Sequence, residues 1–148
     1  MWIIEDTRQK KDLHTLKNEY WSEHGIGVIR SALPFGDYIT APRIAVDTKQ
    51  NIKEIAANMC GAVREKKRFR EECKKAKEAG CILVFLIEEE QYGSIDDLYG
   101  EQIYIHSGVI IPGDQLALAM NTMSGRYGCR FEFCKPEEAG QRVVELLR

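Results

Sequence analysis

The sequence lacks the features of a membrane protein and of a protein from an oxidising compartment. No apolar run approaches the ~20 residues of a membrane-spanning helix, and charged residues follow the first four apolar residues too closely for a signal peptide. The five cysteines are an odd number without a C-x-x-C pair, and the three histidines are scattered, so no zinc-binding spacing is present. We therefore expect a soluble, cytoplasmic protein with reduced thiols and no association with a membrane.

A strong excess of charge of either sign is also absent. The formal net charge of -2 over 148 residues argues against a protein that coats nucleic acid by charge alone. Positive charge is instead concentrated between Arg64 and Lys77, where eight lysines and arginines accompany three glutamates. Taken by itself, such a run indicates a solvated helix face.

The apolar pattern alternates between helical and strand periods. A length of 148 residues and an apolar fraction of 44% suit one domain with one core. The continuous apolar run at 81–87 predicts a strand buried on both faces. Further strands are expected at 2–4, 28–33, 102–106 and 130–133, and helices at 12–24, 51–59, 65–79, from 114 and from 136. This order predicts an α/β fold with a mixed central sheet and helices on both faces.

Several of the expected helices carry specific predictions. In the helix at 12–24, Leu13, Leu16 and Tyr20 share one stripe, which we expect to pack inward.

Asn51 and Asp114 are expected to be the N-terminal caps of the helices that follow them. In the helix at 65–79, Phe69, Cys73 and Ala76 are expected to face inward.

A predicted β-hairpin with its turn at 41–42 carries the chemically informative residues. Side chains alternate along a strand, so Asp47 and Lys49 face the same way. Residues equidistant from the turn lie opposite each other, which places Asp37 beside Val46 or Asp47. Two carboxylates and one ammonium would then share one patch at an edge of the sheet.

Phosphodiester hydrolysis requires a set of this kind. Two carboxylates can hold Mg²⁺ or Mn²⁺, and such a cation polarises the phosphoryl group and lowers the pKa of a bound water. A lysine can orient that water or stabilise developing charge. Asp6, at the end of the first strand, could supply a third carboxylate, and Glu88 ends the buried strand in the same way. The alternatives are a surface ion pair between Asp47 and Lys49 and a capping role for Asp6.

The sequence resembles the nuclease domain of the XPF family, within the PD-(D/E)XK restriction-endonuclease-like superfamily, in its short standalone bacterial and phage form. The segments that carry the resemblance follow the family's order and spacing. They are Ile3–Arg8 for the opening strand and D-x-R-E motif, Gly36-Asp37-Tyr38 for G-D-[YF], Val46–Lys49 for V-E-R-K, Arg68-Phe69 for R-[FY], and Leu83–Glu88 for the apolar strand that ends in I-E.

This resemblance implies a restriction-endonuclease-like fold over residues 1–148. It implies a metal-dependent DNA endonuclease, structure-specific for branched or flap DNA, that acts in repair or recombination. The catalytic residues would be Asp6, Asp37, Asp47 and Lys49, and Mg²⁺ or Mn²⁺ would be held by Asp6, Asp37, Asp47 and the carbonyl of Thr48. The residues expected to contact DNA are Arg8, Lys66, Lys67, Arg68 and Arg70.

The sequence departs from the family pattern at three acidic positions. Asp47 stands where the signature has glutamate, Gln9 where a glutamate follows D-x-R, and Lys53, next to Glu54, where an acid follows the lysine. The alternative function is therefore a non-catalytic DNA-binding or assembly module on the same fold. The retention of Asp37, Asp47 and Lys49 favours catalysis.

The helix-hairpin-helix motifs that hold the dimer in larger relatives are absent from the sequence. We therefore expect a homodimer or a complex with a partner protein. The C-terminal elements at 130–133 and 136–148 are the expected interface, because they follow the strands that carry the site.

Overall fold

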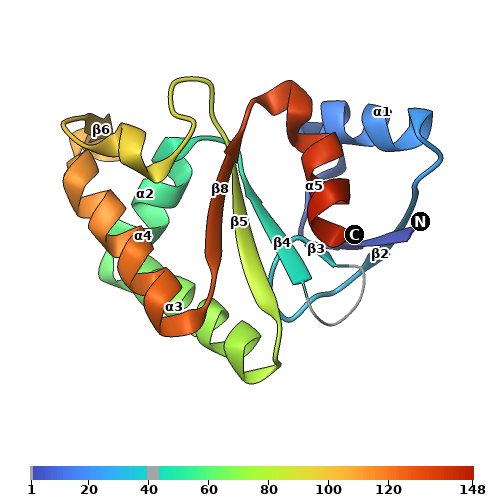
Figure 1. Ribbon diagram of the computed structural model, residues 1–148, viewed down its shortest axis with the longest axis horizontal. Helices are drawn as coiled ribbons and strands as arrows, with labels where there is room; N and C mark the ends of the chain where they lie inside the picture. Colours follow the sequence, from blue (N-terminus) through green and yellow to red (C-terminus); the bar gives the residue numbers. More distant parts are fainter. Residues whose placement is uncertain (1, 40–43) are drawn as a thin grey trace.

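The computed structural model describes residues 2–39 and 44–148, and the strands within these ranges form a mixed central sheet (Figure 1). Its six strands lie in the order β2-β1-β3-β4-β5-β8. They are β1 (Trp2–Asp6), β2 (Gly27–Ser31), β3 (Tyr38–Ile39), β4 (Ile44–Lys49), β5 (Ile82–Glu88) and β8 (Arg130–Cys134). Among these strands β3 alone runs antiparallel to its neighbours. The predicted mixed sheet is confirmed.

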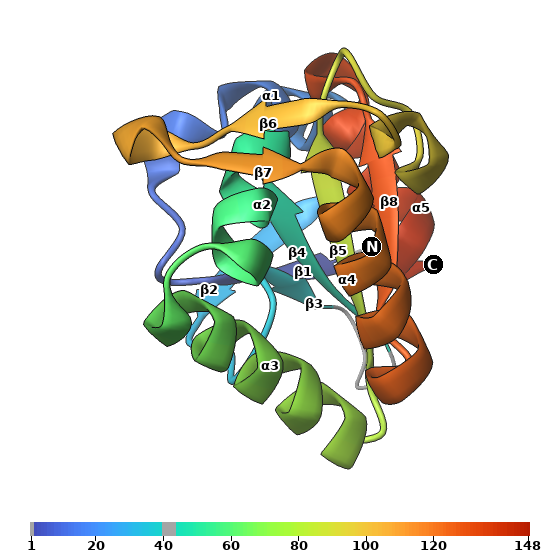
Figure 2. The same cartoon turned by 90° about the vertical axis from the view of Figure 1, so that its left-hand side faces the viewer.

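Helices cover both faces of this sheet, as the sequence predicts. One face packs against α1 (Thr15–Glu23) and α5 (Ala139–Leu147), with the 3₁₀ turns η1 (Lys11–Leu13) and η4 (Pro136–Glu138) preceding them. The other packs against α2 (Ile52–Cys60), α3 (Val63–Glu78) and α4 (Gly113–Tyr127), which lie in front of the sheet in Figure 2. Within the described ranges, no helix combines the length and apolar character required to cross a bilayer.

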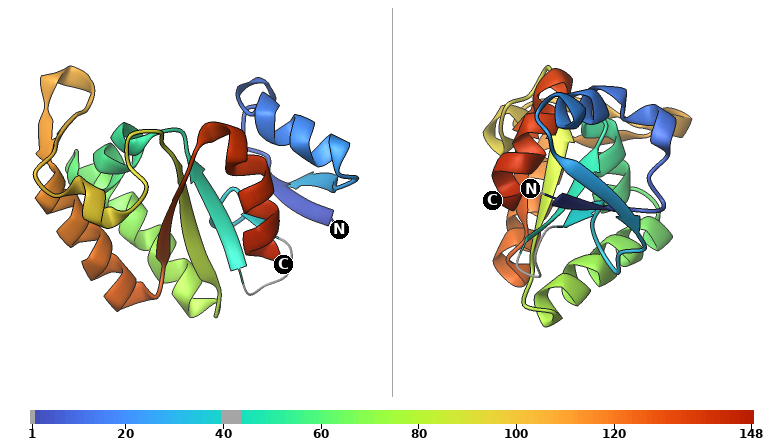
Figure 3. Two further views of the ribbon diagram at one scale, coloured as in Figure 1. Left: turned by 45° about the horizontal axis from the view of Figure 1, so that its top comes forward. Right: turned by 90° about the vertical axis from the view of Figure 1, so that its right-hand side faces the viewer.

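A small hairpin stands out from this body. Strands β6 (Gln102–Tyr104) and β7 (Ile110–Pro112) pair only with each other among the described strands, with the turn η3 (His106–Gly108) between them and η2 (Ile95–Leu98) before them. Figure 3 shows the hairpin at the end of the molecule farthest from β2. The strand predicted at 102–106 therefore exists, but it does not belong to the central sheet.

Strand β5 is the centre of both cores. Leu83, Phe85 and Ile87 belong to the core beneath α2, α3 and α4, and Val84 and Leu86 to the core beneath α1 and α5. Full burial of side chains of this size contributes roughly 1.5–3 kcal/mol each. Because both faces are covered, the strand has the continuous apolar sequence that predicted it.

Local signals set the ends of the helices that carry the site. The side chain of Asn51 accepts a hydrogen bond from the Glu54 amide at 2.9 Å, which confirms the predicted cap of α2. Helix α3 buries Phe69, Cys73 and Ala76 as predicted. It ends before Gly80, whose φ of 70° suits glycine.

The predicted inward stripe of the first helix is wrong for Leu13 and Leu16, whereas Tyr20 is partly buried against the core beneath α1 and α5. Leu13 is 58% exposed and Leu16 is 53% exposed, whereas Lys17 and Trp21 are buried. The expected single helix is divided at His14 into a 3₁₀ turn and α1, so its apolar positions do not keep one phase. Tertiary contacts then decide the buried face, since the Trp21 indole donates to the carbonyl of residue 140 at 3.0 Å.

Asp114 is not the cap of α4. The N-terminal cap is Pro112, and Asp114 lies in the first turn of the helix. Its carboxylate accepts a hydrogen bond from the Gly100 amide at 2.8 Å, so it closes the preceding loop instead. Sequence position alone does not distinguish the two roles, because both place an aspartate at the start of a helix.

His14 makes the stability of the fold sensitive to acid. Burial and the charge of Lys17 lower the pKa of His14 to about 4, and its Nδ1 atom is buried without a hydrogen bond to any described residue. In the unfolded state His14 has an ordinary pKa of about 6.5. At a pH below that value the unfolded state therefore binds a proton at His14 that the folded state does not bind. The contribution of neutral His14 to the free energy of unfolding is therefore fully present above about pH 6.5 and is lost as the pH falls towards 4. We expect His14→Gln to show a smaller loss of unfolding midpoint between pH 7 and pH 5 than wild type. Equal losses would contradict this assignment.

Candidate active site

The register of the hairpin brings the two predicted carboxylates together. Tyr38 pairs with Val46 and Ile39 with Ala45, so the next position outward sets Asp37 opposite Asp47. The Asp37 amide donates to the Val46 carbonyl at 2.7 Å. The prediction that Asp37 lies beside Val46 or Asp47 is confirmed, while the turn at 41–42 on which it was based lies outside the described residues.

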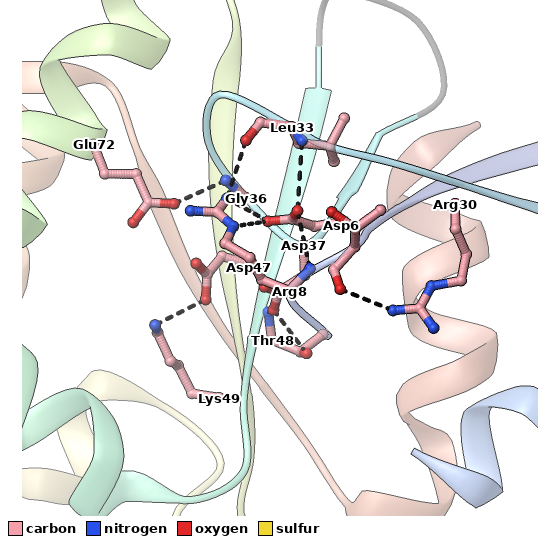
Figure 4. A network of polar contacts seen from close by, with 11 residues as sticks. Asp6, Arg8, Arg30, Leu33, Gly36, Asp37, Asp47, Thr48, Lys49 and Glu72 are labelled. Carbon is pink, nitrogen blue, oxygen red and sulfur yellow. Dashed lines mark hydrogen bonds and ion pairs between the residues drawn. The ribbon is translucent and has the colours of Figure 1, made fainter. Parts of the chain in front are cut away.

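Asp37 is held by the backbone of β4. Its Oδ2 atom accepts hydrogen bonds from the Thr48 amide at 2.5 Å and the Thr48 hydroxyl at 3.0 Å (Figure 4). Burial and the neighbouring Asp47 raise the pKa of Asp37 well above its usual range, whereas Lys49 and the two Thr48 bonds oppose that rise. Two close carboxylates in a buried place favour a cation between them.

Asp47 and Lys49 face the same side of β4 and form an ion pair, with 2.9 Å between Nζ and Oδ1. Both side chains are largely buried, at 12% exposed for Lys49 and 8% for Asp47. Burial opposes the charge on Lys49, but Asp47 and Asp37 outweigh that effect and raise the pKa of Lys49, so the ammonium stays charged. The ammonium lies 5.8 Å from the centroid of the Phe85 ring.

Asp6 lies next to this pair but is engaged by Arg8. The Arg8 guanidinium forms an ion pair with the Asp6 carboxylate and donates to the Leu33 carbonyl at 3.0 Å. The Asp6 amide donates to the Asp37 carbonyl at 2.7 Å. Asp6 and Arg8 therefore hold the segment between β2 and β3 against the end of β1, and this segment carries Asp37.

Glu72 belongs to the same place, although the sequence analysis did not include it. Its Oε1 atom accepts a hydrogen bond from the Gly36 amide at 2.8 Å. Burial, and then the charge of Asp47, raise the pKa of Glu72 to about 7. The spacing from Arg68, one helical turn earlier, could have indicated it, because residues at i and i+4 share a helix face.

These side chains line one recess of about 290 Å³ between the hairpin and α3. The charged residues around it are Asp6, Arg8, Asp37, Asp47, Lys49, Arg68, Glu71, Glu72 and Lys75. Figure 4 shows the polar contacts that tie its inner wall together. The recess brings together every acid and base that the sequence analysis assigned to catalysis.

The positively charged side chains expected to contact DNA do not all lie on the same surface. Arg8 and Arg68 line the recess, together with Lys75, which the sequence analysis did not single out. Lys66 and Arg70 line a different, largely apolar groove beside Leu118, and Lys67 is exposed to solvent. One helix therefore presents positive charge in more than one direction.

Glu88 does not belong to the recess, which corrects the expectation from its place at the end of β5. Its carboxylate accepts from the buried Lys17 ammonium at 2.7 Å. This contact lies on the sheet face covered by α1. Glu88 directly follows Ile87, so its side chain points to the opposite face of the sheet, because side chains alternate along a strand.

The donor set suits a hard cation. Apart from its ion pair with Lys49, the buried Oδ1 atom of Asp47 has no hydrogen-bond partner among the described residues. Within those residues no three histidine, cysteine or acidic side chains are already gathered as a metal cluster, so two carboxylates with backbone or water oxygens would be the ligands. Magnesium and manganese accept such an all-oxygen set with several retained waters.

The ERCC4 domain family model matches residues 6–147 of the chain. The chain belongs to the ERCC4 domain family. This assignment confirms the resemblance to XPF-type nuclease domains that the motifs indicated. Comparison with curated proteins gave no match.

Solved structures agree with the fold of this ERCC4 domain. XPF from Aeropyrum pernix matches with a TM-score of 0.68 and 19% identity, over 100% of this chain and 64% of that chain. XPF from Aeropyrum pernix in complex with DNA matches with a TM-score of 0.68 and 18% identity, over 99% of this chain and 63% of that chain. The chain thus spans just under two thirds of these solved chains, and the likeness confirms the restriction-endonuclease-like fold.

Proposed function

We propose that this ERCC4 domain is a metal-dependent endonuclease that hydrolyses phosphodiester bonds in DNA with Mg²⁺ or Mn²⁺. The observation that carries the proposal is the convergence of Asp37, Asp47 and Lys49 in one recess. A non-enzymatic module has no need of a buried ion pair next to a second buried carboxylate, because each buried charge costs free energy of folding.

The contacts and the family resemblance together assign each residue a role. Asp37 and Asp47, with the Thr48 carbonyl, would hold the cation, and Asp6 would support them from the end of β1. A cation held there would act as a Lewis acid on the phosphoryl group and would lower the pKa of a bound water. Lys49, charged and fixed by Asp47, orients the attacking water or neutralises charge that develops on the phosphate.

We further propose that the substrate is branched or flap DNA, in repair or recombination. A structurally similar XPF chain from Aeropyrum pernix is in complex with DNA, which supports DNA as the substrate. Arg68 and Lys75 line the recess from α3 and are exposed to solvent, which suits a DNA backbone that approaches along the helix.

The decisive experiment is cleavage of labelled flap, fork, four-way junction and plain duplex DNA. Each is incubated with Mg²⁺, with Mn²⁺ and with a chelator. We expect cleavage that depends on the cation and that differs between branched and plain duplex DNA. Binding without cleavage under every condition would instead favour the non-catalytic module, a reading to which Gln9 and Lys53 at acidic positions of the family pattern already point.

Arg68 and Lys75 are expected to contribute more to DNA binding at the site than Lys66 and Arg70. Only the first pair lines the recess, while both pairs carry equal charge on the same helix. The double variant Arg68→Ala/Lys75→Ala should reduce the slope of log affinity against log salt by about two units, because each lost phosphate contact removes about one. Filter binding over a salt series measures the slope, and Lys66→Ala/Arg70→Ala is the matched control. An equal reduction in both variants would show that α3 contacts DNA without regard to the recess.

We propose that the domain self-associates or works with a partner protein, and that the interface includes the edge of β8. The apolar side chains of α5 are buried in the core of the chain itself, so they are not available to a second copy. Among the described strands β8 lies at one end of the sheet, and a sheet edge is a template for another strand. Stable interfaces of obligate dimers bury roughly 2,000 Å² or more. Sedimentation at micromolar concentration, with and without DNA, tests the proposal, and a monomer that cleaves efficiently would overturn it.

A further inference from the structure

We infer that Glu72 is a positioning residue that fixes Asp37 in the site from helix α3. The inference rests on the proposed nuclease function. Its central contact is the 2.8 Å hydrogen bond from the Gly36 amide to the Glu72 carboxylate, drawn in Figure 4. Gly36 directly precedes Asp37, so the contact acts on the backbone that carries the catalytic carboxylate.

The backbone at Gly36 leaves little freedom at this point. Gly36 has a φ of 70°, and a Cβ atom there would lie 3.2 Å from Ala45 Cβ and 3.4 Å from the Val46 carbonyl. The segment therefore lies close against β4 in a conformation that other residues rarely adopt. Its amide hydrogen is directed to α3, and Glu72 accepts it.

The hydrogen bond of Gly36 completes a series of anchors along the segment. The Leu33 carbonyl is held by Arg8, the Phe35 ring is buried in the core, and the Asp37 amide and carboxylate are held by β4. These anchors attach the segment to the sheet and its core. Glu72 supplies the hydrogen bond from α3, and a missing anchor next to Asp37 leaves its carboxylate less well placed.

The position of Glu72 on α3 connects the two sides of the recess. Arg68 precedes it by one turn and Lys75 follows it by nearly one turn, and all three line the recess. The helix that presents positive charge to DNA is thereby linked directly to the segment that carries Asp37. We assign Glu72 to the backbone and not to the metal because its carboxylate accepts a hydrogen bond from the Gly36 amide.

Two substitutions separate these roles. Glu72→Gln keeps an oxygen that can accept from Gly36, whereas Glu72→Ala removes it. We expect Glu72→Ala to lower kcat by about 10–100-fold, the usual effect of a lost supporting contact, with KM for DNA changed by only a few-fold. Glu72→Gln should recover most of kcat. The control is Glu78→Ala, an exposed acid near the end of the same helix.

A second measurement does not depend on activity. Amide hydrogen exchange followed by NMR should show at least tenfold faster exchange of the Gly36 amide in Glu72→Ala, with the amides of β5 unchanged as evidence that the fold is intact. Manganese binding by calorimetry should weaken in Glu72→Ala and stay near wild type in Glu72→Gln. These two results stand even if wild type cleaves no DNA, in which case the proposed function fails and the positioning role does not.

Two outcomes would overturn the inference. If the Gly36 amide exchanges at the wild-type rate in Glu72→Ala, the hydrogen bond does not hold the segment. If Glu72→Gln loses kcat and manganese binding as completely as Glu72→Ala while Gly36 remains protected, Glu72 acts by its charge as a ligand and not by position.

Discussion

Replacement of Asp47 by asparagine is expected to lower DNA cleavage by on the order of 10²–10³-fold, the range observed when one stabilising group of a transition state is removed. Asparagine keeps an oxygen but loses the negative charge that attracts a divalent cation. Asp37 would remain as the single carboxylate of the proposed ligand pair, and Lys49 would lose its ion-pair partner at 2.9 Å. Calorimetric titration with Mn²⁺ should show much weaker binding than wild type.

The matched control for this prediction is Asp12→Asn, the same chemical change at an exposed aspartate before α1. It should cleave and bind metal as wild type does. Denaturant unfolding of both variants separates a loss of the site from a loss of the fold. Equal affinity of Asp47→Asn and wild type for Mn²⁺ would refute the assignment of Asp47 as a ligand.

Replacement of Lys49 by methionine is expected to lower cleavage by on the order of 10²-fold while metal binding is retained. Methionine keeps an unbranched apolar stem near the Phe85 ring but removes the ammonium. Metal binding should become equal or tighter, because Asp47 no longer has a competing cation beside it. The opposite directions of rate and affinity distinguish Lys49 from a residue that merely supports the fold.

The same variant tests how much the buried pair contributes to stability. Removal of one partner of a buried ion pair typically costs about 3–5 kcal/mol, so the unfolding midpoint should decrease unless metal is added. Lys53→Met on the exposed side of α2 is the matched control and should leave rate and stability unchanged. A Lys49→Met variant that cleaves at the wild-type rate would restrict Lys49 to a structural ion pair.

Much of the site could be predicted because its geometry is local in the sequence. Asp37 and Asp47 are ten residues apart, one directly before β3 and the other on β4, and antiparallel pairing fixes which residues lie opposite each other. Asp47 and Lys49 share a side of β4 by the period of two along a strand. The cap of α2 by Asn51 and the apolar run of β5 are equally local signals, and both were predicted correctly.

The errors at α1 and at Glu88 concern contacts between residues that are far apart in the chain. Lys17 is buried because Glu88, 71 residues away, meets it, and Trp21 is buried because its indole reaches a carbonyl 119 residues away. The periodicity of the α1 sequence indicates neither of these contacts. The error at Glu88 has the same cause. Its position at the end of a strand did not reveal which face of the sheet its side chain would occupy.

Helix α3 shows the boundary between the two kinds of information most clearly. Its sequence alone determined that it is helical, that Phe69, Cys73 and Ala76 face inward, and that it is rich in positive charge. Its rotation and position over the sheet were decided by tertiary packing, as the Phe69 ring stacks on Phe85 with their centroids 4.6 Å apart. That rotation directs Glu72 towards Gly36 and places Arg68 and Lys75 on the recess. The side chain that completes the site from α3 is therefore visible only once the helix is packed, because a helical period defines faces but not what each face meets.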